Sequence, residues 1–379
     1  MSWSFWEQES FIKKPDVIVI GSGIVGLNAS LAIKLKHPSL HVLVLERGAL
    51  PYGASTRNAG FACFGSISEL LSDLKKNSHQ EVFDLVEKRY QGLQRMRQII
   101  GDSNLDYEEF GGYEIFSPTQ HTLSTNCISE IEAFNNELEK ITGKKNTYSL
   151  VNDQISQFGF ENVNHIIKNA EEGQINTGKM MKVLLEKCRQ AGVEILNGIK
   201  VIELFQKNNS VQLILENNFT LESKKVLIAT NGFAHELLPE YDVKPARAQV
   251  LITQPIKGLK IKGSFHYEEG YYYFRNVGDR ILFGGGRNLA FENENTDEFG
   301  LTQLIQNTLE KLLSEMILPQ TSFVVDQRWS GIMGLGDHKY PIIKKVNDNI
   351  YCCVRMGGMG IALGSLAAQE SAELILNDL

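Results

Sequence analysis

The chain has 379 residues, 42% of them apolar, which is enough for two joined domains that each bury a core. It carries 38 basic and 45 acidic residues, a formal net charge of −7. This balance argues against a nucleic-acid partner, because no surplus of basic groups is available to displace counterions.

The cysteines and the lack of long apolar runs indicate the cellular compartment in which the protein is expected. The five cysteines form no C-x-x-C pair and leave an odd count, which favours a reduced, cytoplasmic protein. No run of 18 apolar residues occurs, so no transmembrane segment is expected. Residues 1–7 lack a basic segment followed by an apolar core, so no secretory signal is expected there.

The first predicted strand, residues 16–20, leads directly into a G-x-G-x-x-G pattern and then a helical run. Gly21 permits a tight turn, Gly23 lets the backbone approach a pyrophosphate, and Gly26 lets the helix lie close to the strand. The helix N-terminus then offers free N–H groups and a partial positive charge to that pyrophosphate. This context predicts a bound dinucleotide.

A second predicted strand, residues 42–45, ends on Glu46, whose carboxylate is placed to accept hydrogen bonds from the ribose of an adenosine. The following residues 47–60 are too rich in turn formers for the helix that an NAD domain would have here. Such a segment suits FAD, because its small residues allow close approach while Ser55, Thr56, Arg57 and Asn58 donate hydrogen bonds. The alternative is a plain surface loop.

Periodicity and turn signals predict the remaining elements. Helices are expected over 67–74, 81–100, 123–142, 180–191 and 301–313, and strands over 112–116, 193–196, 199–204, 211–215, 219–223 and 226–229. Residues 243–329 are expected to form a largely antiparallel sheet, and the acidic segment 292–298 within it a solvated loop.

The last segment combines a strand over 350–354, a glycine loop over 357–360 and a helix over 361–376. A helix N-terminus behind glycines is an anion site, and reduced flavin carries negative charge at the pyrimidine end of its ring. We therefore expect this helix to stabilise reduced flavin. A simple helix start is the alternative.

Several segments resemble the FAD-dependent D-amino acid oxidase superfamily, in particular its glycine oxidase, sarcosine oxidase and gamma-glutamylputrescine oxidoreductase branch. The likeness begins at residues 46–60, and the matching segments follow one another in the same order as in the family, as far as the glycine loop over 357–362. The intervening segments that carry it are 226–232, 245–250, 272–275, 282–287 and 329–331.

The resemblance implies an α/β, two-domain fold in which a Rossmann-like FAD-binding domain is interleaved with a substrate domain built on a mainly antiparallel sheet. The FAD-binding domain is expected to comprise residues 1–78, 150–235 and 328–379. The substrate domain is expected to comprise residues 79–149 and 236–327.

The residues expected to hold the cofactor come from the motifs and from the resemblance together. They are Gly21, Ser22, Gly23, Ile24, Val25, Gly26, Glu46, Arg47, Ala54, Ser55, Thr56, Arg57, Asn58, Ala59, Gly60, Val201, Thr230, Asn231, Gly232, Gly331, Gly357, Gly358, Met359, Gly360 and Ile361.

Substrate contacts are predicted from one strand and three arginines. Tyr271 and Tyr273 share a face of a strand that can line the substrate side of the flavin, although core packing explains such a stripe as well. Arg275 and Arg287 are candidates to bind a carboxylate, with surface salt bridges as the alternative. Arg355, two residues before the glycine loop, is a further candidate.

Three departures from the resembled family limit what can be carried over. Residues 331–337 lack the arginine with which glycine and D-amino acid oxidases grip a carboxylate, which puts a conventionally bound free amino acid in doubt. Residues 281–283 lack the oxygen-activating lysine of sarcosine oxidases. No cysteine lies between Trp329 and Pro341, so a non-covalent flavin is expected, and the electron acceptor is left open between oxygen and a quinone or other carrier.

The sequence therefore predicts an FAD-dependent oxidoreductase that oxidises the carbon–nitrogen bond of an amine or N-substituted amino acid to an imine. One alternative keeps the fold and oxidises a 2-hydroxy acid or polyol phosphate instead. The other is a non-catalytic flavin sensor or partner protein.

Overall fold

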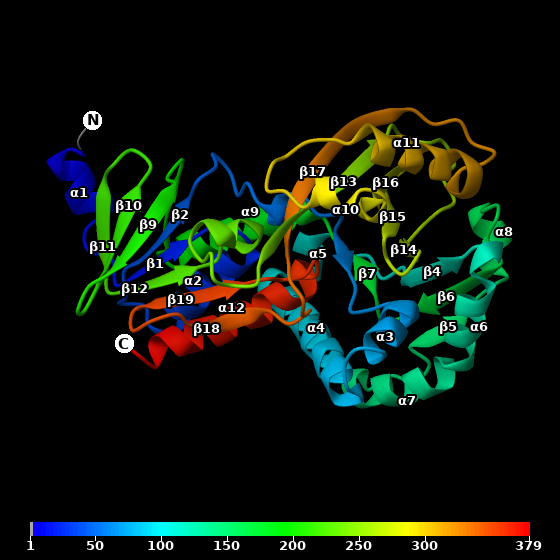
Figure 1. Cartoon of the computed structure of the whole chain (residues 1–379), viewed down its shortest axis with the longest axis horizontal. Coiled ribbons are helices and arrows are strands. Elements are labelled where there is room, and N and C mark those ends of the chain that lie inside the picture. The colour runs from blue at the N-terminus through cyan, green and yellow to red at the C-terminus, as the bar shows by residue number, and fades with distance from the viewer. Residues whose placement is uncertain (1–2) are drawn as a thin grey trace.

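The computed structural model describes residues 3–379 and consists of two large sheets set side by side along the long axis of the molecule (Figure 1). The first two residues of the predicted non-secretory N-terminus lie outside the described residues. From Trp3 onward the chain forms a short helix, α1 (Phe5–Phe11), before entering the first sheet. None of the helices in residues 3–379 is long and apolar enough to cross a membrane.

The first sheet is the Rossmann-like one, with strand order β18-β19-β12-β1-β2-β8. All pairings are parallel except the antiparallel β18–β19 pair at one edge. Its strands are β1 (Val17–Ile20), β2 (Val42–Glu46), β8 (Glu194–Asn197), β12 (Lys225–Ile228), β18 (Ile342–Lys345) and β19 (Ile350–Val354).

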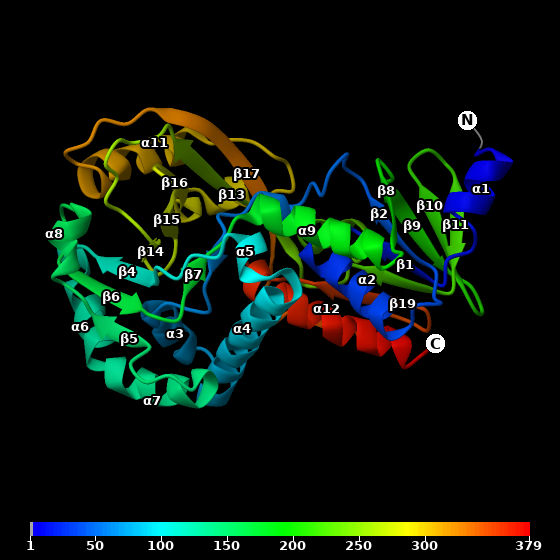
Figure 2. The same ribbon diagram turned by 180° about the vertical axis from the view of Figure 1, so that it is seen from behind.

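Both faces of this sheet are covered, which explains why β1 is apolar at every position. Val17 and Val19 pack in a core with the helices α2 (Ile24–Lys36), α9 (Thr177–Gln190) and α12 (Gly360–Leu376). Figure 2 shows these helices on the near side of the sheet. Ile18 and Ile20 pack instead against a three-stranded sheet of β9 (Val201–Gln206), β10 (Val211–Leu215) and β11 (Thr220–Ser223).

The second sheet has the order β17-β13-β16-β15-β14-β4-β6-β5 and is antiparallel except between β14 and β4. Its strands are β4 (Gly112–Phe116), β5 (Tyr148–Leu150), β6 (His165–Asn169), β13 (Lys244–Thr253), β14 (Ser264–Tyr267), β15 (Tyr272–Val277), β16 (Arg280–Gly285) and β17 (Val325–Leu335). The long pair β13–β17 reaches back toward the first sheet (Figure 1).

The remaining elements cover the second sheet and connect it to the first. They are α3 (Ile67–Leu74), α4 (His79–Ile100), α5 (Asp102–Leu105), α6 (His121–Ser129), α7 (Ile131–Thr142), α8 (Gln154–Phe158), α10 (Phe291–Glu294), α11 (Gln303–Leu312) with the π-helical turn Leu313–Ile317, and a small sheet of β3 (Phe61–Ala62) and β7 (Gly173–Gln174). Short 3-10 turns span Ala54–Thr56, Pro118–Gln120, Asn231–Glu236 and Arg287–Leu289.

The predicted fold class is confirmed, and three details differ from expectation. The single helix expected over 123–142 is two helices, because the chain breaks at Glu130 between α6 and α7. The acidic segment 292–298 is not simply solvated: Glu294 is fully buried because Arg247 of β13 pairs with it.

The third detail concerns the predicted domain boundaries. Strands β5 and β6 pair into the second sheet, so the boundary expected at residue 150 falls inside that sheet. The boundary expected at residue 328 likewise falls within β17. Both segments pair with strands of the second sheet, and the division into two domains stays a prediction.

Candidate functional site

A cavity of about 540 Å³ lies between the two sheets and is lined by residues of both. One half is built from the turn after β1, the end of β2, residues 53–60 and the loop before α12. The other half is a face of the second sheet together with part of α3. A ligand bound here would therefore touch segments from almost the whole length of the chain.

The N-terminus of α2 opens into this cavity. Gly21 turns the chain with φ +105°, and a Cβ on Gly26 would lie 1.9 Å from the Gly21 carbonyl oxygen, so the helix can approach the turn only with glycine there. The helix-capping residue is Gly23, which has no side chain that could accept hydrogen bonds from the N–H groups of the first turn. The Ile24 N–H is instead bonded to Ser55 Oγ at 2.9 Å. The helix N-terminus is thus an anion site.

Glu46 at the end of β2 lines the cavity and is almost fully buried. Its Oε2 accepts hydrogen bonds from Ser22 N–H (3.0 Å) and Ser22 Oγ (2.8 Å), and its Oε1 accepts one from Gly48 N–H (2.9 Å). These bonds hold the carboxylate at the cavity wall and leave it further acceptor capacity for a ligand hydroxyl.

The loop over residues 53–60 lies along the cavity next to α2. Asn58 closes its turn, since its amide donates to the Ala54 and Ser55 carbonyls and its Oδ1 accepts from Gly60 N–H. Arg57 donates to the Ser330 carbonyl at 3.0 Å and lies 4.3 Å over the Phe299 ring. The loop is therefore pinned to the second sheet as well as to the first.

The loop before α12 brings a second helix N-terminus to the same cavity. Gly357 and Gly358 have φ values of +59° and +81°, and the capping residue Met359 offers no side-chain hydrogen bond. Asn231 Oδ1 accepts from Met356 N–H at 3.0 Å and so fixes the loop to the end of β12. Next to it, Thr230 Oγ1 is buried in the cavity wall without a hydrogen-bond partner.

The face of the second sheet that closes the cavity is mainly apolar and aromatic. Tyr271 and Tyr273 line it, whereas Tyr272 and Phe274 point into the core on the other side. Burial raises the pKa of Tyr273 to about 12, so its phenol stays neutral. His266 of β14 also lines this face; burial lowers its pKa to about 4, and its Nε2 has no hydrogen-bond partner.

A cluster of charges closes the cavity beside α3. Glu69 Oε1 lies 3.2 Å from Arg89 Nη2 and 2.8 Å from Lys339 Nζ, and Lys339 also pairs with Asp73 at 2.8 Å. Burial alone would raise the pKa of Glu69, but Arg89 and Lys339 lower it to about 2. Glu69 is thus a carboxylate at any ordinary pH, and Lys339 is neutralised by its partners.

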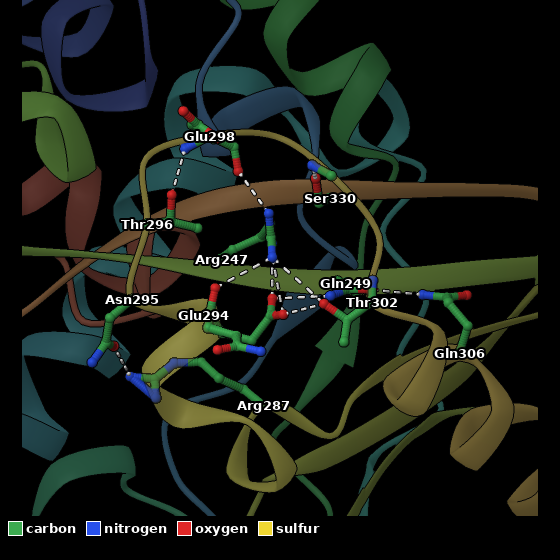
Figure 3. A network of polar contacts seen from close by, with 12 residues as sticks. Arg247, Gln249, Arg287, Glu294, Asn295, Thr296, Glu298, Thr302, Gln306 and Ser330 are labelled. Carbon is green, nitrogen blue, oxygen red and sulfur yellow. Dashed lines mark hydrogen bonds and ion pairs between the residues drawn. The ribbon is translucent and has the colours of Figure 1, made fainter.

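Arg287, just after β16, lines the cavity on the sheet side and is surrounded by a polar network that does not include a carboxylate for it. Figure 3 shows the Glu294 carboxylate facing Arg247, while Arg287 points toward Asn295. Arg247 Nε and Nη2 lie 2.9 and 3.1 Å from the two oxygens of Glu294, and Gln249 Nε2 and Thr302 Oγ1 also donate to that carboxylate.

Most of the sequence-predicted site residues lie around this one cavity. Those that line it are Gly21, Gly23, Ile24, Val25, Glu46, Arg47, Ala54, Ser55, Arg57, Asn58, Ala59, Gly60, Val201, Thr230, Asn231, Gly232, Gly331, Gly357, Gly358, Met359, Gly360, Ile361, Tyr271, Tyr273 and Arg287. The N-terminal and C-terminal glycine loops, more than 330 positions apart, therefore share a site.

Five predicted residues lie outside the lining, each for a visible reason. Ser22 is turned toward Glu46, Gly26 packs against the turn, and Thr56 donates to the Pro51 carbonyl at 2.7 Å. Arg275 is buried under Gly60 and donates to the Ile175 carbonyl at 2.9 Å. Arg355 pairs with the Asp242 carboxylate at 2.9 Å. Both arginines are corrections to the substrate candidates, because neither lines the cavity.

Several cavity residues were missed by the sequence reasoning, among them the titratable residues Glu69, His266 and Lys339. No spacing pattern signals them, since Glu69 and Lys339 are 270 positions apart. The antiparallel sheet expected over 243–329 could not show which of its two faces His266 would occupy.

Comparison with known proteins shows the family to which the chain belongs. A family model described as "FAD dependent oxidoreductase" (DAO) matches residues 16–374. The chain is 22% identical to "Probable oxidoreductase OrdL" of Haemophilus influenzae, over 97% of this chain and 84% of that protein. It is 24% identical to gamma-glutamylputrescine oxidoreductase of Escherichia coli, over 96% of this chain and 84% of that protein. The crystal structure of glycine oxidase from Bacillus cereus superposes with a TM-score of 0.73 at 18% identity, covering 97% and 96% of the two chains.

Proposed function

Because this chain belongs to the DAO family of FAD-dependent oxidoreductases, we propose that it oxidises the carbon–nitrogen bond of an amine or N-substituted amino acid. The observation that supports this most directly is the continuity of the cavity, which runs from the α2 N-terminus to the aromatic face of the second sheet. A cofactor cradle and an enclosed substrate wall thus belong to one space.

The residues present fit FAD. The helix N-termini of α2 and α12 suit a pyrophosphate and an anionic ring edge respectively, and Glu46 suits a ribose. The orphaned Thr230 Oγ1 is a buried polar atom that a ligand would satisfy. We propose that the lining residues of the first sheet hold FAD non-covalently. Cys63 also lines the cavity, but burial raises the pKa of its thiol and keeps it a poor nucleophile.

FAD, when bound, accepts the hydride that leaves the carbon next to the amine nitrogen. The lone pair of the neutral amine nitrogen would form the double bond as the hydride leaves, and water would convert the resulting iminium ion to a carbonyl compound and a protonated amine. The protein has to exclude water from this step and to favour the neutral amine. Tyr273 and His266 on the sheet face suit both needs, since each is buried and neutral and the buried Nε2 of His266 has no hydrogen-bond partner within the described residues.

The name of the gamma-glutamylputrescine oxidoreductase also supports an amine as the substrate class. We further propose a reducing compartment such as the cytoplasm, because all five cysteines, each of them within the described residues, are buried and free.

An anaerobic reduction screen of the purified holoprotein tests this proposal. We expect amines or N-substituted amino acids to bleach the visible flavin absorbance and to release a carbonyl product. Reduction by 2-hydroxy acids or polyol phosphates with amines inert would replace the proposal by the alcohol-oxidising alternative, and flavin that no small donor reduces would favour a non-catalytic role. Repeating the screen in air with an oxygen electrode separates an oxidase from a dehydrogenase.

A further inference from the structure

We propose that one carboxylate oxygen of Glu69, Oε2, accepts a hydrogen bond from the N–H group of the substrate amine. The preferred substrates are then primary or secondary amines, whose reacting nitrogen carries a hydrogen, rather than tertiary amines. This inference rests on the proposed function, and it names the substrate class of the same site. It starts from the hydrogen bonds that the Glu69 carboxylate accepts and from the oxygen that they leave out.

The two oxygens of the Glu69 carboxylate are used unequally. Oε1 accepts from Arg89 Nη1 and Nη2 at 3.2 Å each and from Lys339 Nζ at 2.8 Å. Among residues 3–379 no hydrogen bond reaches Oε2, although the side chain lines the cavity and 24% of its surface is exposed. One oxygen therefore fixes the carboxylate, and the other keeps its acceptor capacity for a ligand.

The partners of Oε1 hold the Glu69 side chain in place. Arg89 of α4 is almost fully buried, and its Nη1 also donates to the Phe64 carbonyl at 3.1 Å, so its guanidinium is fixed. Lys339 is bonded at the same time to Asp73, one turn further along α3. A carboxylate held from two sides is oriented before a ligand arrives, which lowers the entropy cost of binding.

The charge around Glu69 suits an amine that is neutral when it reacts. Glu69 and Asp73 supply two negative charges. Arg89 and Lys339 supply two positive charges, so the formal charges of this group cancel. An unbalanced carboxylate would favour the ammonium form of the amine, which has no lone pair to give. Oε2 instead offers a hydrogen-bond acceptor within a group of charges that is neutral overall.

The other three carboxylates of the cavity lining are placed differently. Glu46 lies in the half proposed for the cofactor and already accepts three hydrogen bonds. Glu236 is paired with Arg47 at 3.1 Å. Glu269, in the turn after β14, forms no ion pair among residues 3–379, but it is exposed, so water satisfies it. Glu69 combines a fixed position with an unbonded oxygen.

Glu69 shares its end of the cavity with the sheet face proposed for the substrate. Its negative charge counteracts the lowering of the His266 pKa by burial, and His266 in turn helps to lower the pKa of Glu69. The ring of His266 lies 5.2 Å from that of Phe61, which lies 5.7 Å from that of Tyr273. All four residues line the cavity. An amine whose N–H group points at Oε2 would thus lie beside these rings.

The hydrogen bond to Oε2 also acts on the reaction itself. As the hydride leaves the carbon, the lone pair of the nitrogen becomes the second bond of the carbon–nitrogen double bond, and the N–H group gains positive charge. Its hydrogen bond to the Glu69 carboxylate becomes stronger at that point, so it stabilises the transition state more than the bound substrate. A tertiary amine has no N–H group and gains nothing from Oε2.

The test compares indole with benzofuran as ligands of the flavin-loaded protein, followed by the shift of the flavin spectrum. The two probes have nearly the same shape and no charge, but only indole carries an N–H group. In the wild type we expect indole to bind about ten-fold more tightly, the effect of one hydrogen bond to a charged group. Equal affinities, or no binding of indole, would overturn the proposal.

Glu69→Gln reverses the polarity of the group at this position. Its amide oxygen should face Arg89 and Lys339, because both are donors, and its NH2 group then takes the place of Oε2. The affinities for indole and benzofuran should therefore come to lie within about two-fold of each other. A Glu69→Gln protein that keeps the wild-type preference for indole would refute the assignment.

Asp73→Asn is the matched control. It removes a carboxylate from the same helix and from the same lysine, but Asp73 does not line the cavity. This variant should keep the wild-type preference for indole. An equal loss of the preference in both variants would count against the proposal, because the ion-pair cluster and not Oε2 would then be responsible.

If Glu69→Gln does not fold, the wild-type protein decides. The best secondary amine of the reduction screen should be oxidised with a kcat/KM at least about ten-fold above that of its N-methylated, tertiary analogue, and equal values would overturn the assignment. A preference for indole that depends on Glu69 in a protein that no amine reduces would leave the hydrogen-bond site standing and refute the proposed function alone.

Discussion

Replacing Gly26 by alanine tests whether the close approach of α2 to the turn after β1 is what shapes the cofactor cradle. The new Cβ would lie 1.9 Å from the Gly21 carbonyl oxygen and 3.2 Å from Val19 Cγ1. Ordinary contacts begin near 3.4 Å, so either the turn or the helix must move by about 1.5 Å. The obstructing atom belongs to the backbone, and therefore no rotamer change relieves the contact.

Overpacking of this kind costs about 1–3 kcal/mol. In the apoprotein the turn can relax and avoid part of that cost, whereas bound FAD requires the turn in its present place. Most of the penalty should therefore appear in cofactor binding, as an increase of about 5-fold to about 150-fold in the Kd for FAD. The assay is a titration of deflavinated protein with FAD, followed by flavin fluorescence, together with the flavin content of the protein as purified.

Gly178→Ala is the matched control, because Gly178 lies in the first turn of α9, where a Cβ meets nothing closer than Asn176 Oδ1 at 3.4 Å. This variant should bind FAD as the wild type does and be as stable or slightly more stable, since alanine favours the helix. A Gly26→Ala protein with wild-type flavin affinity and an unchanged Tm would refute the reasoning.

Three further predictions concern single buried groups. Thr230→Val should weaken FAD binding by about 2-fold to about 12-fold without lowering the Tm of the apoprotein, because the lost hydroxyl has no protein partner; a destabilised apoprotein would contradict this. Burial raises the pKa of Glu172 to about 8, so the folded state keeps a proton that the unfolded state loses above pH 4.5 or so, and stability falls as pH rises between these values. Glu172→Gln, which abolishes this titration, should therefore gain about 2–3 kcal/mol relative to wild type between pH 5.5 and 7.5 in thermal unfolding, and a pH-independent difference would count against it. Glu294→Ala should cost about 3 kcal/mol, because the half-buried Arg247 loses the carboxylate that neutralises it. Glu292→Ala at an exposed position should change stability by less than about 0.5 kcal/mol; similar Tm values for the two variants would disprove the role of the pair.

The cofactor half of the site could be predicted well from the sequence, because its chemistry is local. The turn after β1 needs glycine at φ +105°, and the next glycines follow within one turn of the same helix. Glu46 lies at the end of the next strand, and parallel pairing of β1 with β2 brings it to the same sheet edge. Chain order and backbone conformation therefore determine where these groups lie.

The substrate half could not be predicted in the same way. Arg275, Arg287 and Arg355 look equivalent as residues on or after strands, yet the structure places only Arg287 of the three in the cavity lining. Arg275 and Arg355 are turned to the Ile175 carbonyl and to Asp242. Which partner an arginine finds depends on which segments the fold brings within about 4 Å, and those segments are far apart in the chain.

The amino-acid sequence by itself determined the elements, the dinucleotide motif and the family, since hydrophobic periodicity, glycine conformations and capping act between neighbours along the chain. Only the tertiary structure decided which charges are neutralised by a partner. Glu294 belongs to an acidic segment that reads as solvated, and it is buried because Arg247, 47 positions away, reaches it. Coulomb and hydrogen-bond energies act over a few ångströms in space, and the sequence alone does not contain those distances.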